Sequence, residues 1–147
     1  MQLITYVTFA GQCEEALNFY KEVLGGEILQ ISYMGDGQMQ VPEHVKGKVM
    51  HARLKIGESV LYMSDTFDPE ALKQGNNISL SLEIKTTDEL EKLFNKLSAG
   101  GTVKMPLGDM FWGARFGMFI DKFGIHWMMN CELSDRTPSE KKEPALN

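Results

Sequence analysis

The sequence has few cysteines, no long apolar run and no excess of positive charge. Its 147 residues include only Cys13 and Cys131, too few for a disulfide-built scaffold, so we expect free thiols in a reducing compartment. No run of about 18 or more apolar residues and no charged-then-apolar leader occur, which predicts a cytoplasmic protein with no membrane partner. The net charge is −5 and the basic residues are scattered among acids, which excludes the basic cluster that nucleic acid requires. The expected partner is a small molecule or another protein.

Several catalytic motifs are absent as well. The chain has no glycine-rich phosphate loop, no G-x-S-x-G turn, no C-x-x-C pair and no H-E-x-x-H helix. These absences argue against P-loop, serine hydrolase, dithiol redox and zinc protease chemistry. What remains is an ordinary globular composition, 43% hydrophobic and 24% charged, with enough length for one compact unit of roughly 100–200 residues.

The stretch from Phe9 to Ile28 carries the signal of a strand, a helix and a second strand, and the signal recurs later in the chain. Its apolar residues fall at the spacing that places them on one face of a helix: Ala16, Leu17, Phe19, Tyr20, Val23 and Leu24. Gly25-Gly26 would end this helix. The second copy of the signal spans Glu83 to Val103, and its helix begins at the capping residue Thr86 and ends before Gly100-Gly101, with one extra residue before the glycines. We therefore predict a duplicated unit with one helix in each copy.

Alternating apolar and polar residues predict the strands of each copy. In the first copy they are expected at residues 3–9, 27–33, 49–56 and 59–64, and in the second at 77–85, 102–105, 116–120 and 125–131. The long segment 34–48 between two of them is a candidate lid. The fold class predicted is α+β, with two tandem βαβββ modules of about 1–66 and 77–132 in one domain of residues 1–134. Residues 135–147 are polar and contain proline, which predicts a disordered tail.

Four segments carry a resemblance to a known family. They are G-Q-C-E-E-A-L-N-F-Y-K-E-V-L-G-G, V-M-H-A-R-L-K-I-G, Y-M-S-D and W-G-A-R-F-G-M-F-I-D-K-F-G-I-H-W, and the resemblance spans residues 1 to about 132. In this order they resemble the vicinal oxygen chelate superfamily, which includes glyoxalase I, bleomycin-resistance proteins and extradiol dioxygenases, and within it the PhnB-like branch. The resemblance implies mixed sheets that curl around a cleft, one helix per module on the outer face, and a homodimer.

Metal-dependent members of this superfamily hold their ion with four inward-facing strand residues, normally His, Gln or Glu. The resemblance places those positions at Thr5, Tyr62, Ser79 and Met128. Zinc needs imidazole or thiolate, and nickel, manganese or iron in this setting needs imidazole and carboxylate, so this set would bind such ions poorly. We therefore expect no metal quartet and no cofactor.

A different cluster of side chains could still bind a metal or transfer protons in the cleft. Because side chains alternate along a strand, Ser81 and Glu83 should share the face of Ser79, and His126 and Asn130 the face of Met128. With His51 from the first module, the trio His51, Glu83 and His126 could bind a divalent metal or transfer protons. His51 and His126 are thus the candidate catalytic residues, although a histidine such as His51 is more often a hydrogen-bonded sheet histidine than a catalyst.

The loop around Trp112 offers candidate ligand contacts. Trp112 beside a glycine could stand at the edge of a cavity, and Arg115 could fork onto a carboxylate or phosphate. Alternatively, Trp112 covers the core and Arg115 pairs with a surface acid. Trp127 and Met129 face the helix by parity and are expected in the core. The candidate ligand-binding residues are Tyr62, Ser79, Ser81, Glu83, Trp112, Arg115 and Asn130.

The sequence favours a protein that binds a small, partly apolar, anionic molecule in its cleft without the usual metal quartet. One alternative is a metal-dependent lyase, isomerase or dioxygenase that uses His51, Glu83 and His126. Another is a resistance protein that sequesters an antibiotic without chemistry. The same scaffold supports several activities, so the fold does not choose among them.

Overall fold

The computed structural model of the protein describes residues 1–133, and the chain divides into two compact units. Module 1 is Met1–Lys73 and module 2 begins at Gln74. Each contains one helix and four strands in the order βαβββ, as the sequence predicted. The tail predicted at residues 135–147 lies outside the described residues. Within residues 1–133, neither helix is long and apolar enough to cross a membrane.

The elements lie close to their predicted bounds. Module 1 contains β1 (Thr5–Phe9), α1 (Cys13–Leu24), β2 (Glu27–Tyr33), β3 (Val49–Ile56) and β4 (Ser59–Asp65). Module 2 contains β5 (Leu80–Glu83), α2 (Thr87–Ser98), β6 (Thr102–Asp109), β7 (Ala114–Ile120) and β8 (His126–Glu132). Strand β5 is shorter than predicted, and β6 continues through Pro106, where a loop was expected. Because β6 is an edge strand whose pairing with β7 shifts around this residue, the missing N–H of proline is tolerated there.

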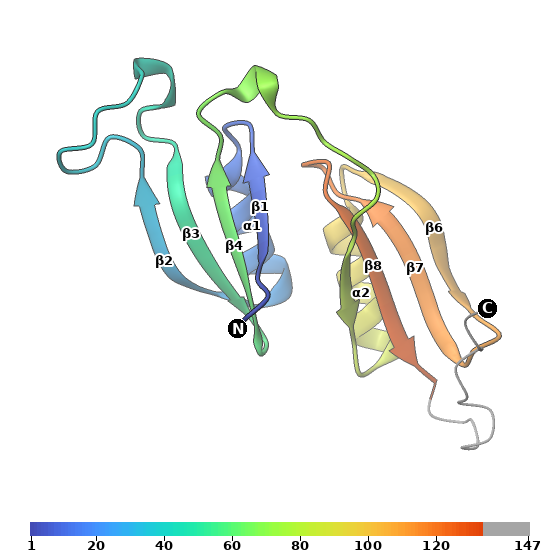
Figure 1. The fold of residues 1–147 in the computed structure, drawn as a ribbon. Coiled ribbons are helices and arrows are strands. Elements are labelled where there is room, and N and C mark those ends of the chain that lie inside the picture. The colour runs from blue at the N-terminus through green and yellow to red at the C-terminus, as the bar shows by residue number, and fades with distance from the viewer. Residues whose placement is uncertain (134–147) are drawn as a thin grey trace. The chain divides into compact units, whose positions relative to one another are not determined.

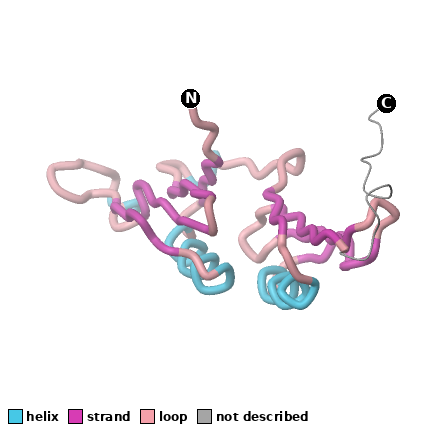
Figure 2. The backbone as a smooth tube through the Cα atoms, turned by 90° about the horizontal axis from the view of Figure 1, so that it is seen from below, coloured by secondary structure: helices cyan, strands magenta, loops and turns pink. Residues whose placement is uncertain are grey.

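Each module is a four-stranded mixed sheet with a helix on one face. The strand orders are β1-β4-β3-β2 and β5-β8-β7-β6, and in each sheet only the first pair is parallel. Figures 1 and 2 show α1 and α2 each against one side of its own sheet. The opposite side carries no helix of its module, and we call it the open face. Functional side chains are therefore sought on the two open faces.

The cores lie between each helix and its sheet. The buried side chains of module 1 include Cys13, Ala16, Leu17 and Tyr20 of α1 with Ala52, Leu54, Leu61 and Met63 of the sheet. Those of module 2 include Leu90, Phe94 and Leu97 of α2 with Phe119, Trp127 and Met129. The Phe94 and Phe119 rings meet edge to face at 5.1 Å. Burial of each large apolar side chain contributes about 1.5–3 kcal/mol, and Trp127 and Met129 are in the core as predicted.

In each glycine pair that follows a helix, the first glycine is required for its backbone conformation and the second for lack of space. Gly25 and Gly100 have φ of 67° and 77°, the left-handed conformation that lets the chain leave a helix. Gly26 and Gly101 are needed for space instead. A Cβ on Gly26 would lie 2.8 Å from a backbone carbonyl oxygen of β3, and one on Gly101 would overlap a carbonyl oxygen of β7.

A buried carboxylate, Asp65, joins three segments of module 1 at the end of β4. Its Oδ1 accepts hydrogen bonds from the backbone N–H groups of Gly11 at 2.8 Å and Cys13 at 3.0 Å. Its Oδ2 accepts one from Val49 at 2.9 Å. The side chain thereby ties the start of α1 and the start of β3 to β4.

The predicted lid, residues 34–48, is closed at its base. Met34 donates to the carbonyl of Lys48 at 2.7 Å, and Gly47 donates to the carbonyl of Met34 at 2.9 Å. Met34 and Val45 are buried, and a single 3₁₀ turn spans Glu43–Val45. Figure 1 shows this segment between β2 and β3. The loop is therefore built on a packed base and has some structure of its own.

The Cys13 thiol should be unreactive in the folded protein. Burial, with a smaller contribution from the nearby carboxylates of Asp65 and Glu14, raises its pKa from 9.0 to about 12. The thiolate is the reactive form. We expect the Cys131→Ala protein, which keeps this one thiol, to react with iodoacetamide far more slowly when folded than in urea. Fast labelling of the folded protein would contradict this assignment.

The same shift gives a pH dependence of stability. The folded state keeps the Cys13 proton to a higher pH than the unfolded state does, so the free energy of unfolding should fall as pH rises from about 9 towards 12. At pH values below the pKa of Cys13 in the unfolded state, its contribution to the free energy of unfolding is constant. Urea titrations across this range should show a shallower fall for Cys13→Ala than for the unchanged protein.

Candidate functional site

The open face of module 1 carries a polar cluster of Tyr6, His51, Arg53 and Tyr62. The hydroxyl of Tyr6 lies 3.0 Å from His51 Nδ1, and Arg53 Nε donates to His51 Nε2 at 3.3 Å. The Arg53 guanidinium lies 4.7 Å from the centre of the Tyr62 ring. Both ring nitrogens of His51 are therefore engaged, as in a hydrogen-bonded sheet histidine.

The aromatic rings of this cluster are packed together. The Tyr62 ring meets the His51 ring edge-on at 5.1 Å, and the Tyr6 ring is stacked on the His51 ring at 5.7 Å. Arg53 pairs in register with Tyr62 on one side and with Gln30 on the other, and neither neighbour is an acid. Sequence reasoning found His51 and Tyr62 but missed Tyr6 and Arg53.

One of the predicted metal positions was wrong by one residue. Thr5 pairs with the buried Leu61, so it lies on the side of the sheet that faces α1. Tyr6 pairs with Tyr62 and shares its open face. A shift of one residue along a strand moves a side chain to the other face. The position that the resemblance implied on β1 was therefore on the wrong face.

The donor set does not fit the metal that the superfamily resemblance implies. With Tyr6 in place of Thr5, the four positions carry two phenols, the hydroxyl of Ser79 and the thioether of Met128. Zinc, nickel and iron sites need imidazole, thiolate or carboxylate donors. In the part of the chain that the structure describes, no three His, Cys, Asp or Glu side chains form a metal-binding group. We therefore derive no reaction step through a metal.

Module 2 has the predicted parity on its open face. Ser81 pairs with Met128 and Glu83 with Asn130, while Trp127 and Met129 turn to the core. The Asn130 amide donates to Glu83 at 3.0 Å. Ser79 lies one residue before β5, so this register does not extend to it.

The strand spacing separates the members of the predicted trio that lie in module 2. Glu83 pairs with Asn130, and His126 lies four residues earlier on β8. At about 3.3 Å per residue, this is a separation of about 13 Å along the strand. The two side chains share a face but do not converge on one ion.

Trp112 and Arg115 lie on different faces. The Trp112 ring meets the ring of Phe116, whose partner on β8 is Asn130, so Trp112 stands at one end of the open face. Arg115 is on the side of α2: it is bound by Asp109 at 2.7 Å and by Glu91 of α2 at 2.8 Å. The structure therefore shows the alternative arrangement, in which Arg115 pairs with surface acids. Its role as a ligand contact stays a prediction.

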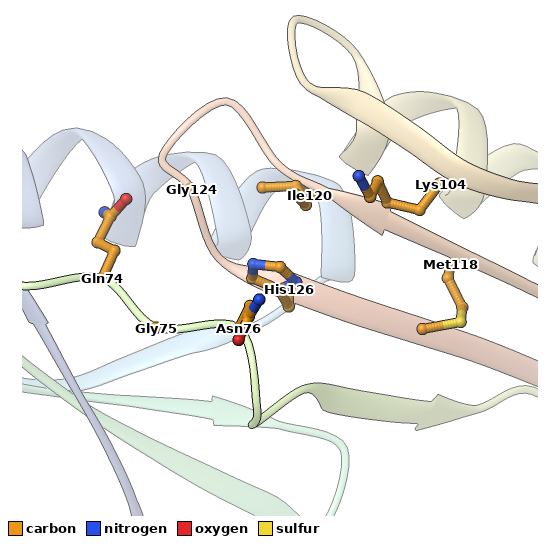
Figure 3. A pocket seen from close by; sticks show the side chains of 8 residues that line it. All are labelled: Gln74, Gly75, Asn76, Lys104, Met118, Ile120, Gly124 and His126. Carbon is orange, nitrogen blue, oxygen red and sulfur yellow. The ribbon is translucent and has the colours of Figure 1, made fainter.

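The other end of this open face is hollowed. The hollow has a volume of about 710 Å³, within the range of small-molecule sites. It is lined by Gln74, Gly75, Asn76, Lys104, Met118, Ile120, Gly124 and His126. Figure 3 shows Asn76 and His126 at its centre, with Gln74 on one side and Lys104 and Met118 on the other. Sequence reasoning found only His126 among these residues.

Each wall of the hollow is placed by a specific backbone feature. Ile120 and His126 face each other as a register pair of β7 and β8. Lys104 lies at the irregularity between Val103 and Met105, where the pairing of β6 with β7 shifts. Such irregularities re-aim side chains at the edge of a sheet.

The turn between β7 and β8 closes the hollow. Gln74 Nε2 donates to the carbonyl of Phe123 at 3.0 Å, which holds the segment before β5 against this turn. Gly124 has φ of 88°, and a Cβ there would overlap the Gln74 side-chain oxygen. A glycine at this position therefore lets Gln74 reach its hydrogen bond.

The turn itself is built on a second buried carboxylate, Asp121. It accepts hydrogen bonds from the backbone N–H groups of Phe123 at 2.9 Å and Ile125 at 3.0 Å. Its other oxygen accepts from the Trp127 indole at 2.8 Å. Because these bonds fix the turn, the start of β8 and His126 are held in place.

The hollow combines one cation with apolar and neutral polar groups. No carboxylate among residues 1–133 forms an ion pair with Lys104. Met118 and Ile120 supply apolar surface, and Asn76 supplies an amide that can donate or accept. This chemistry suits a small molecule with an anionic head and an apolar body.

Comparison with known proteins gives consistent matches over most of the chain. Residues 2–129 match the family model of the Glyoxalase/Bleomycin resistance protein/Dioxygenase superfamily. Protein YjdN of Escherichia coli (strain K12) is 31% identical over 143 residues, which are 88% of this chain and 95% of YjdN. The crystal structure of protein PA1353 from Pseudomonas aeruginosa is 43% identical, with a TM-score of 0.81, and covers 91% of this chain and 99% of its own. A PhnB protein from Bacillus cereus is 28% identical, with a TM-score of 0.76. The match covers 89% of this chain and 99% of the Bacillus cereus chain.

Proposed function

The chain belongs to the Glyoxalase/Bleomycin resistance protein/Dioxygenase superfamily, and from that premise we propose that it binds a small, partly apolar anion in the module 2 hollow. Membership agrees with the resemblance expected from the sequence, including the PhnB-like branch. The superfamily fold does not choose the ligand, because one scaffold carries many activities. The choice must come from the side chains of this chain.

The observation that carries the proposal is the Lys104 ammonium, which has no carboxylate partner among residues 1–133 and lines a hollow with His126. An anion placed there gains a charge-assisted hydrogen bond from Lys104. His126 and Asn76 offer further polar contacts, and Met118 and Ile120 receive the apolar part. Glu83 lies at the other end of the open face, where it would repel an anion.

Butylphosphonate is a suitable probe, with 1-butanol as its uncharged counterpart. We expect saturable changes in the His126 ring and Met118 methyl resonances with the phosphonate and weaker changes with the alcohol. Lys104→Ala should raise the dissociation constant severalfold to about tenfold, because the ammonium is exposed and partly screened. Nuclear magnetic resonance titration measures both effects.

Lys92→Ala is the matched control, since it removes the same charge from an exposed position on α2. If Lys92→Ala and Lys104→Ala weakened butylphosphonate binding equally, the effect would come from net charge alone. That result would refute the assignment of the hollow as the binding site. Chemical conversion of a bound ligand would favour the lyase, isomerase or dioxygenase alternative. Saturable antibiotic binding without conversion would favour sequestration.

A further inference from the structure

We propose that the open face of module 1 carries a second site, which binds a small carboxylate through Arg53 and a second oxygen of the same molecule through Tyr6. The two donors are joined by His51, which contacts both. This site uses no residue of the module 2 hollow.

The direction of the hydrogen bonds follows from the chemistry of the three groups. A guanidinium has only donors, so Arg53 Nε donates and His51 Nε2 must accept. An imidazole carries at least one N–H, so the proton of His51 is on Nδ1. That N–H donates to the Tyr6 oxygen at 3.0 Å. The bonds therefore run one way, from Arg53 through His51 to Tyr6.

This direction leaves the Tyr6 hydroxyl hydrogen to be donated elsewhere. No acceptor for it exists among residues 1–133, and the Tyr6 side chain is exposed at 49%. The N–H groups of the two terminal Arg53 nitrogens likewise have no hydrogen-bond acceptor in the described part of the chain. The cluster thus presents donors at both ends, and neither ring nitrogen of His51 between them is left as an acceptor.

The ligand class follows from these donors. A planar guanidinium fork matches a carboxylate, and the Arg53 guanidinium carbon lies 4.7 Å from the centre of the Tyr62 ring. Tyr6 lies beyond the imidazole ring and two hydrogen bonds, of 3.0 and 3.3 Å, from Arg53 Nε. One carboxylate at Arg53 leaves Tyr6 for a carbonyl or hydroxyl oxygen at the far end of the ligand.

Two probes separate the two donors. 4-Acetylbenzoate has a carboxylate and a distant carbonyl oxygen, whereas benzoate has the carboxylate alone. We expect both to shift the His51 ring resonances saturably while those of His44 stay unchanged. Arg53→Gln should raise the dissociation constant of both about tenfold or more. Tyr6→Phe should raise that of 4-acetylbenzoate about three- to tenfold and leave that of benzoate unchanged.

The matched control is Tyr33→Phe, which removes the hydroxyl that donates to Glu14 on another part of module 1 and should leave both constants unchanged. Nitrogen-15 spectra of the unsubstituted protein test the bond direction directly, and the Nδ1-protonated form of His51 is expected. The proposal is overturned by an Nε2-protonated ring, by absence of saturable His51 shifts with both probes, or by equal effects of Tyr6→Phe on the two. Loss of butylphosphonate binding in Lys104→Ala concerns the other module and leaves this test intact.

Discussion

Asp65→Ala should lower the free energy of unfolding by about 3–5 kcal/mol, because it leaves three backbone N–H groups without an acceptor. Asp65 is only 4% exposed, so water does not readily replace the lost carboxylate. This loss is a large part of the 5–15 kcal/mol by which a typical domain is stable. Urea titration followed by circular dichroism measures it.

Two further variants make this prediction decisive. Asp65→Asn keeps one acceptor oxygen but sets an N–H group against one of the donors, so it should cost an intermediate amount and remain folded. Asp36→Ala removes a carboxylate with one exposed hydrogen bond, from Tyr33, and should cost less than about 1 kcal/mol. Similar losses at Asp65 and Asp36 would mean that the buried carboxylate does not join the three segments.

Gly101→Ala should be as damaging in module 2, with a loss of about 3 kcal/mol or more. The added Cβ would overlap the carbonyl oxygen of Ile120 and lie 2.8 and 2.9 Å from backbone atoms of Asp121. Overpacking usually costs about 1–3 kcal/mol, and here the contacted atoms are backbone, which cannot rotate away. Because Ile120 also lines the hollow, we expect weaker butylphosphonate binding wherever the variant still folds.

The neighbouring glycine provides the control. The Cβ added by Gly100→Ala would make only ordinary contacts with the Lys122 side chain, at 3.4 and 3.7 Å. The loss of stability in this variant would therefore come only from the φ of 77°. That cost is about 1–2 kcal/mol. Thermal and urea unfolding of the two variants should therefore differ clearly. If Gly100→Ala were the more destabilising, close packing against β7 would not be the reason for the second glycine.

The elements and their faces were predictable because their signals are local. The spacing of apolar residues marked α1 and α2, and Thr86 does accept a hydrogen bond from the backbone N–H of Glu89, at 3.2 Å. Alternation placed Trp127 and Met129 in the core and Glu83 with Asn130 on the other face. The helices needed only neighbouring residues of one element, whereas the common face of Glu83 and Asn130 also depended on the positions that the resemblance implied.

The candidate sites were predictable only in part because their contacts join distant residues. Tyr6 and His51 are 45 positions apart, and Gln74 and Phe123 are 49 apart. Which side chains meet then depends on register between strands, which composition does not encode. Arg115 shows the same limit, because its partner on α2 is 24 positions away. The homodimer, the cytoplasmic location and a small, partly apolar, anionic ligand stay predictions.

The glycine pairs also indicate where this duplicated chain can change in length. Gly25 follows α1 directly, whereas Ala99, with φ of −59° and ψ of 129°, stands between α2 and Gly100. Both modules nevertheless bring their second glycine against a strand carbonyl. An insertion of one residue has thus been absorbed at the helix end, upstream of the contact. A codon gained there would be tolerated, whereas one gained between the second glycine and the following strand would shift the register of that strand and turn its side chains to the wrong face of the sheet.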